Sequence, residues 1–153
     1  MRDLVRPSFR PMHLALAVLA AAGVAIAWHP AGEQGGDDRV EVGRVCRSTL
    51  TPGLELSCGT YGFGDLRRVC RDHGSAGRCV LTSAVTVRNT GGSPVYVSVV
   101  SGPRQGVREQ GADLLLVPGQ SATLRPGRQR FLFDITLRRT GDAPGSLEVT
   151  ALV

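Results

Sequence analysis

Apolar residues recur at every second position in several parts of the chain, and this alternation constrains the fold more than any other feature. It is clearest between residues 130 and 139. The residues predicted to share one buried face there are Phe131, Phe133, Ile135 and Leu137. A period of two is that of a β-strand with one face in a core. Outside the first 27 residues no segment has the helical period, so the sequence predicts an all-β domain.

Turn residues divide this pattern into about seven or eight strands. The segment 147–153 follows the turn 140–145, so we expect it to form a C-terminal hairpin with 130–139. A second hairpin is expected from residues 81–88 and 95–99. Shorter strands are predicted at Val40–Val45, Leu54–Cys58, Leu114–Val117 and Ala122–Leu124. Such spacing favours an antiparallel sandwich.

Two stretches carry a resemblance to a known architecture. Residues 85–100 contain the order V-x-N-x-G-x-x-P, and residues 117–124 contain a Pro-Gly turn followed by serine. Both resemble motifs of bacterial extracytoplasmic immunoglobulin-like domains of the CARDB and related types. The resemblance covers residues 85–153 and implies an immunoglobulin-like sandwich, whereas residues 44–80, with four cysteines, depart from it. It implies little about function, because such sandwiches serve adhesion, spacing and substrate presentation alike.

Residues 1–27 have the composition of an export signal. Three arginines precede an uncharged apolar run of about 15 residues, fewer than the ~20 that a membrane-spanning helix needs. Small residues at Ala25 and Ala27 favour cleavage before Trp28. The alternative is an uncleaved anchor helix, in which residues 1–28 are the part of the chain in the membrane. Both alternatives place the protein outside the cytoplasm, either secreted or on the outer face of the cytoplasmic membrane.

The rest of the chain divides into a spacer and one domain. Residues 28–38 are Gly-rich and acidic without apolar periodicity, as in a flexible linker. Residues 39–153 are enough for one domain with a modest core. All 18 basic residues are arginine, which indicates a high-GC bacterial genome. Without the leader the net charge is about +3, so no nucleic-acid partner is expected.

The four cysteines predict two disulfides. An exported chain meets an oxidising environment, and Cys46, Cys58, Cys70 and Cys79 leave no odd member. The sequential pairing, Cys46–Cys58 and Cys70–Cys79, is favoured because each pair then flanks turn residues and closes a hairpin. The nested pairing, Cys46–Cys79 with Cys58–Cys70, stays open. Their spacing is not that of zinc ligands, so no metal is expected.

Catalytic chemistry has little support in the sequence. Only His29 and His73 lie outside the leader, and no G-x-S-x-G elbow frames a serine. Gly62-Phe63-Gly64 lacks the third glycine and the strand-to-helix context of a phosphate loop. We therefore expect a protein that is not an enzyme and needs no cofactor.

The predicted binding surface is a glycine-rich loop with aromatic and arginine residues. Its candidate residues are Tyr61, Phe63, Arg67, Arg68 and Arg71. Disulfides would hold the loop rigid and lower the cost of ordering it on binding. The competing interpretation is that Tyr61 or Phe63 covers the end of the sandwich.

Two functions fit this surface. The first is an exported cell-envelope interaction module whose partner is a protein or an anionic envelope polymer. The second is a diffusible inhibitor of a secreted hydrolase. The sequence does not settle the oligomeric state or the identity of the partner.

Overall fold

A computed structural model of the chain describes residues 38–70 and 78–153. Within them lie eleven strands and one five-residue π-helical turn, named in chain order. The elements are β1 (Val45–Ser48), β2 (Glu55–Ser57), η1 (Gly59–Phe63), β3 (Arg68–Cys70), β4 (Cys79–Leu81), β5 (Val85–Asn89), β6 (Val95–Gly102), β7 (Glu109–Gln110), β8 (Leu114–Leu116), β9 (Ser121–Leu124), β10 (Phe131–Arg139) and β11 (Gly145–Leu152).

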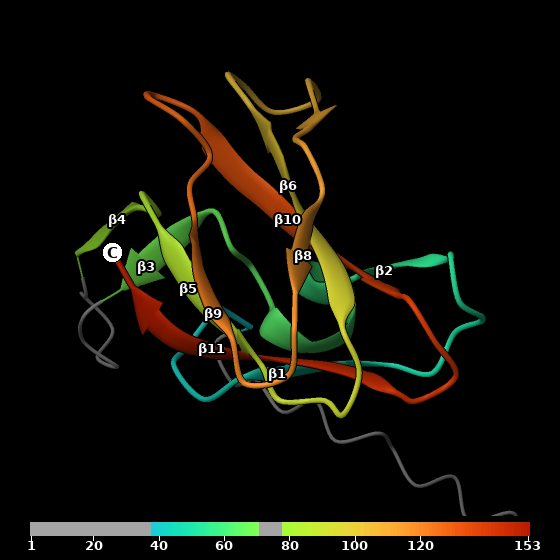
Figure 1. Cartoon of the computed structure of the whole chain (residues 1–153). Coiled ribbons are helices and arrows are strands. Elements are labelled where there is room, and N and C mark those ends of the chain that lie inside the picture. Colours follow the sequence, from blue (N-terminus) through green and yellow to red (C-terminus); the bar gives the residue numbers. More distant parts are fainter. Residues whose placement is uncertain (1–37, 71–77) are drawn as a thin grey trace, which may run out of the picture. The chain divides into compact units, whose positions relative to one another are not determined.

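The strands form two main antiparallel sheets and a small ribbon (Figure 1). One sheet has the order β1-β11-β5-β9, and the other has the order β2-β10-β6-β7 with β8 also paired to β6. The ribbon consists of β3 and β4. Both main sheets contribute to one hydrophobic core, with Val85 and Val149 from the first and Val97 and Ile135 from the second. The predicted all-β, antiparallel class is therefore confirmed. The predicted leader helix and most of the spacer lie outside the described residues.

Both predicted hairpins are wrong. Strand β10 pairs with β6 and β2, whereas β11 pairs with β1 and β5 in the other sheet. Likewise β5 and β6 belong to different sheets. The turns after Asn89 and Arg139 therefore carry the chain across the core. Alternation shows that a strand has one buried face, but it does not show whether the next strand lies beside it or opposite.

Asn89 organises one of these crossings. Its side chain is fully buried at the end of β5. Its Nδ2 donates to the carbonyl oxygens of Ser93 and Leu116, each at 2.9 Å, and its Oδ1 accepts from the Gly91 amide at 2.9 Å. A buried amide side chain persists where its donors and acceptor are satisfied. Asn89 thus ties the turn after β5 to strand β8 of the opposite sheet.

Two β-bulges change which residues face the core. In β10, Leu132 pairs with Ser101 and Asp134 pairs with Val100. Because Ser101 and Val100 are consecutive in β6, Phe133 is an extra residue in β10. Leu132 is consequently buried, while Phe131 and Phe133 are only half-buried, against the predicted common face with Ile135. In β11 the register skips one residue after Val149. A bulge inserts one residue and reverses the faces on one side of it.

Three short strands were not predicted. They are β3, β4 and β7, each two or three residues long. The predicted strand at 40–45 begins only at Val45, and before it Arg39 forms an isolated parallel bridge with Asp65. Within residues 38–70 and 78–153 no helix is both long and apolar enough to cross a membrane.

Candidate functional site

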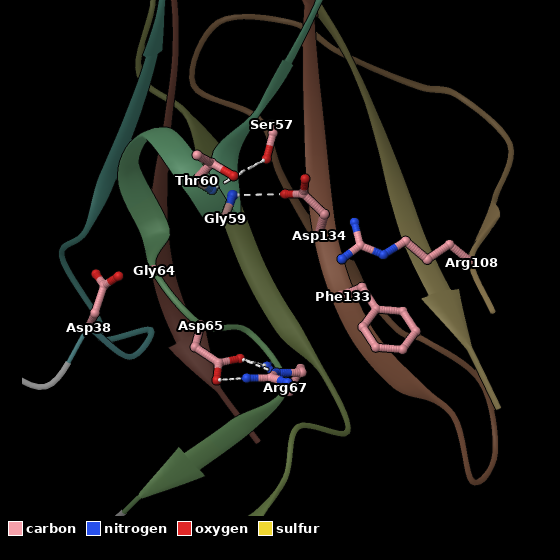
Figure 2. Close-up of a pocket in the computed structure, with 10 residues that line it drawn as sticks. All are labelled: Asp38, Ser57, Gly59, Thr60, Gly64, Asp65, Arg67, Arg108, Phe133 and Asp134. Carbon is pink, nitrogen blue, oxygen red and sulfur yellow. Dashed lines mark hydrogen bonds and ion pairs between the residues drawn. The ribbon is translucent and has the colours of Figure 1, made fainter. Parts of the chain in front are cut away.

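A polar depression of about 390 Å³ lies beside the bulge of β10 (Figure 2). The bulge places two consecutive side chains, Phe133 and Asp134, on the same depression. The other lining residues are Asp38, Ser57, Gly59, Thr60, Gly64, Asp65, Arg67 and Arg108. Segments far apart in the sequence, from the turn η1 to the loop before β7, thus meet at one place.

Asp134 fixes the turn η1 to the sheet. Its Oδ1 accepts hydrogen bonds from the amides of Gly59 and Ile135, both at 2.8 Å. A side chain at Gly59 would crowd this carboxylate, because a Cβ there would lie 3.0 Å from Asp134 Oδ1. Asp134 is buried apart from a small exposed fraction. Its Oδ1 is therefore a structural acceptor, and it holds one wall of the depression in place.

Asp65 and Arg67 form a bidentate pair at the rim. Arg67 Nε and Nη2 donate to the two Asp65 oxygens at 2.9 and 2.8 Å, and the Arg67 amide donates to Oδ1 at 2.9 Å. The side-chain hydrogen bonds from Arg67 lower the pKa of Asp65, against an opposing effect of burial. The same contact raises the pKa of Arg67. The Asp65 carboxylate, in the segment that leads into β3, thus orients the Arg67 side chain.

The predicted binding residues do not form one surface. Tyr61 is exposed, at 67%, but Phe63 has no exposed area and belongs to the core. The expectation that Phe63 is an exposed anchor is therefore wrong, and the competing interpretation applies to it. Arg67 and Arg68 are both exposed. Arg71 lies outside the described residues.

The aromatic residues near Arg67 come instead from β10. Phe131 and Phe133 stack with ring centroids 6.0 Å apart. The Arg108 guanidinium lies over the Phe133 ring at 5.3 Å (Figure 2). A recess of about 40 Å³ is lined by Arg67, Gln105 and both phenylalanines. Arg67 is therefore the member of the predicted set that lies beside these two half-buried rings.

Two arginine-bearing loops meet next to this stack, at the same end of β6 and β10 (Figure 1). Loop 103–108 follows β6 and loop 125–130 precedes β10, and the pairing of Phe131 with Gly102 brings them together. Their arginines, which we call the arginine end, are Arg104, Arg108, Arg125, Arg128 and Arg130. Residues from β7 and loop 125–130 jointly line a further depression of about 300 Å³.

Little negative charge balances the arginine end. Arg130 forms an ion pair with Glu109 at 2.5 Å and donates to Ser101 Oγ at 3.3 Å. Among the described residues, Arg104, Arg125 and Arg128 are exposed and form no ion pair. Exposed guanidinium groups on two adjoining loops create a local positive potential despite the modest net charge of the chain.

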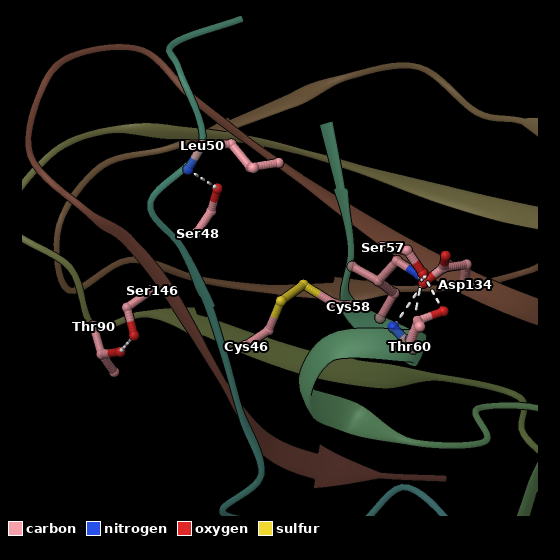
Figure 3. The surroundings of a disulfide bond; sticks show 11 residues. Cys46, Ser48, Leu50, Ser57, Cys58, Thr60, Thr90, Asp134 and Ser146 are labelled. Atoms are coloured by element: carbon pink, nitrogen blue, oxygen red, sulfur yellow. Dashed lines mark hydrogen bonds between the residues drawn. A yellow bond between two sulfur atoms is a disulfide. The ribbon is translucent and has the colours of Figure 1, made fainter. Parts of the chain in front are cut away.

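The two disulfides have the favoured sequential pairing. Cys46–Cys58 is fully buried and joins β1 of one sheet to the end of β2 in the other, next to η1 (Figure 3). It therefore braces the core across the two sheets, against the expectation that it closes a hairpin. Cys70–Cys79 joins directly paired residues of the β3–β4 ribbon, as expected.

Comparison with known proteins gives no match: no family model, no curated protein and no solved structure is similar to this chain. Within residues 38–70 and 78–153 no three His, Cys, Asp or Glu side chains converge as metal ligands would. His29 and His73 lie outside the described residues. The functional argument therefore depends on the chemistry of the described surface alone.

Proposed function

We propose that this protein is an exported, non-enzymatic module of the cell envelope that binds an anionic polymer through its arginine end. The observation that carries the proposal is the meeting of loops 103–108 and 125–130, which together hold five arginines and no acidic residue. Residues 1–27 would direct export and either anchor the domain or be removed. Two disulfides suit the oxidising environment outside the cytoplasm.

The chemistry of the arginine end favours a polymer with repeated charges. Each guanidinium can bind a carboxylate or phosphate through two parallel N–H donors. Three of the arginines have no intramolecular ion pair among the described residues, so binding need not first break one. The arginines lie on two separate loops, and a chain carrying successive anionic groups could contact both of them. Neutralising several charges at once also releases counterions, which makes the affinity depend on salt.

A protein partner held by the loop 59–70 has less support. Phe63 and Leu66 are fully buried, and Gly62 lies against the backbone of Cys46. The segment therefore packs on the sandwich, whereas an inhibitor of a hydrolase would need a loop that protrudes. Tyr61 alone offers a large exposed aromatic side chain there. For this reason the envelope module is the function that we propose.

We also propose that the sandwich is immunoglobulin-like, in line with the resemblance of residues 85–153. Support comes from its connections: the chain crosses between the two sheets after β5, β8, β9 and β10, while β6, β7 and β8 follow one another in the same sheet. Sandwiches with Greek-key connections share this feature. In such a scaffold the loops at one end of the sheets are free to vary, and the arginine end is built from two of them.

The test compares two variants with equal loss of charge. The first replaces Arg104, Arg125 and Arg128 by glutamine. The matched control replaces Arg47, Arg68 and Arg88, which are exposed on other strands. Binding is measured by sedimentation with isolated cell walls, and by titration with polyphosphate and polygalacturonate as defined anionic probes, at 50 and 200 mM salt.

We expect the first variant to lose at least about tenfold in affinity at 50 mM salt, with a salt slope lowered by roughly 2 to 3. The control should retain its affinity within about threefold, because the charges it loses are on β1, β3 and β5 and not on the two loops. An equal loss in both variants would show that net charge and not this surface is responsible. Failure of the native protein to bind any of the three probes would overturn the proposal.

A further inference from the structure

The two disulfides differ in their access to solvent. Cys46 and Cys58 have no exposed area, and the core surrounds them. Cys70 and Cys79 are only half-buried, at the end of the two-stranded β3–β4 ribbon. A thiol reagent must reach a sulfur along the axis of the S–S bond, so accessibility is the first condition for exchange. Only the ribbon disulfide meets it in the folded domain.

Cys70 also lines a depression of about 360 Å³. Its remaining walls are Val40, Glu41, Val42, Val69 and Leu152. Val42 is 61% exposed, so the depression opens to solvent on that side. The depression is separate from the arginine end and from the polar depression beside the β10 bulge. It brings solvent to Cys70, whereas Cys46 and Cys58 have no exposed area.

Arg39 places a positive charge on this disulfide. Its Nη1 donates to Cys79 Sγ at 2.8 Å and also contacts Cys70 Sγ. The backbone of Arg39 is held by the bridge to Asp65, where the Val40 amide donates to the Asp65 carbonyl at 3.1 Å. A guanidinium next to sulfur stabilises a thiolate and lowers the pKa of the thiol. A sulfur that leaves as a stabilised thiolate leaves faster.

We propose that Cys70–Cys79 is a site of thiol–disulfide exchange, with the depression at Cys70 as the approach for an external thiol and Arg39 as the stabiliser of the leaving thiolate. The thiolate of the external reagent attacks Cys70 Sγ, the S–S bond breaks, and its electron pair stays on Cys79 Sγ beside the guanidinium. A mixed disulfide on Cys70 results. A second external thiolate then attacks the external sulfur, releasing an oxidised disulfide and leaving the two protein sulfurs reduced and free to take up protons.

The exchange leaves the rest of the fold tied together. The core keeps its own disulfide, Cys46–Cys58, and the ribbon keeps hydrogen bonds such as that from the Thr82 amide to the Arg67 carbonyl at 3.1 Å. Breaking the Cys70–Cys79 bond therefore loosens the β3–β4 ribbon. It leaves the core in place, because neither cysteine belongs to the core. The site acts as a local redox element in a domain that stays folded.

The experiment follows both disulfides in the native protein. Purified protein is incubated with reduced glutathione, or with a thioredoxin-type dithiol protein, and quenched with acid at intervals. Peptide mapping then locates the adducts. Trypsin separates the two cysteines of interest, because Arg71 and Arg78 lie between them in the sequence. Arg39→Gln is compared with Arg68→Gln, which removes an exposed charge two residues from Cys70.

We expect Cys70–Cys79 to react at least about tenfold faster than Cys46–Cys58, with the first adduct on Cys70. Arg39→Gln should slow the reaction roughly threefold or more, whereas Arg68→Gln should stay within about twofold of the native rate. Arg39→Lys, which keeps a positive charge, should react at a rate between those of Arg39→Gln and the native protein. Reaction with glutathione alone, or with the dithiol protein alone, would identify the source of the thiol.

Equal rates at the two disulfides, or a first adduct on Cys79, would overturn the proposal. So would an Arg39→Gln protein that reacts at the native rate. The ratio of the two rates and the position of the adduct are measured in the native protein, so they decide the question even where a variant does not fold.

Discussion

Replacing Asn89 by alanine is the sharpest test of how the two sheets are joined. The Asn89 amide makes three hydrogen bonds, to Gly91, Ser93 and Leu116, and its side chain has no exposed area. Alanine fits the strand backbone but supplies no donor or acceptor. The carbonyl of Leu116, which belongs to the opposite sheet, then loses a buried partner.

The expected cost follows from these three contacts. A buried polar group left without a partner costs about 1–3 kcal/mol, and we assign this to the bond with Leu116, which is fully buried. The other two bonds are partly buried and contribute about 0.5–1.5 kcal/mol each. The free energy of unfolding should therefore fall by about 2–6 kcal/mol, a large share of the ~5–15 kcal/mol of a typical domain.

The assay is urea unfolding of the oxidised protein, followed by far-UV circular dichroism. Thr90→Ala is the matched control, since its hydroxyl shares only an exposed hydrogen bond with Ser146 at 2.8 Å. We expect the control to change stability by about 0.5 kcal/mol or less. A cost below ~1 kcal/mol for Asn89→Ala, or one equal to the control, would refute the view that this side chain joins the sheets.

Three further outcomes are expected. Phe63→Ala should lower the free energy of unfolding by about 3–5 kcal/mol, whereas Tyr61→Ala should leave it nearly unchanged in the same assay, because only Phe63 lies in the core. Gly102→Ala should destabilise the fold, since a Cβ there would lie 1.8 Å from a carbonyl oxygen of the following loop, and thermal unfolding measures this. The lowered pKa of Asp65 means that its pairing with Arg67 stabilises the fold at pH values above the unfolded pKa of ~3.9, and that this is lost as the pH falls through the folded pKa. The free energy of unfolding of Arg67→Gln should therefore lie below that of the native protein at pH 7, and this difference should become smaller at pH 2. Equal differences at the two pH values would contradict the pairing.

The sequence predicted the strands well and their partners poorly. Alternation marked β10 and β11, and the turn residues around 140–145 marked the break between them. Whether such strands pair or face each other depends on contacts that local composition does not encode. Asn89 was part of a recognised motif, yet only the position of Leu116 on the opposite sheet shows why an asparagine is needed there. The bulge at Phe133 was likewise hidden, because an inserted residue leaves the composition of the strand unchanged.

The candidate surface shows the same limit more strongly. The sequence placed aromatic and arginine residues together at 59–71, where they are neighbours along the chain, but burial of Phe63 and Leu66 removes most of the apolar contact area. The arginine end joins two loops that are separated by β7, β8 and β9 in the sequence, and neither loop is notable alone. A signal did exist: each of the two loops carries at least two arginines beside a strand predicted to face the core. Reading them as one surface required knowing that β6 and β10 pair with their ends in register, so that Gly102 meets Phe131 and both loops emerge at the same edge. The proposed binding surface thus depends on strand pairing. Neither loop forms it alone, and the sheet brings the two charged loops together.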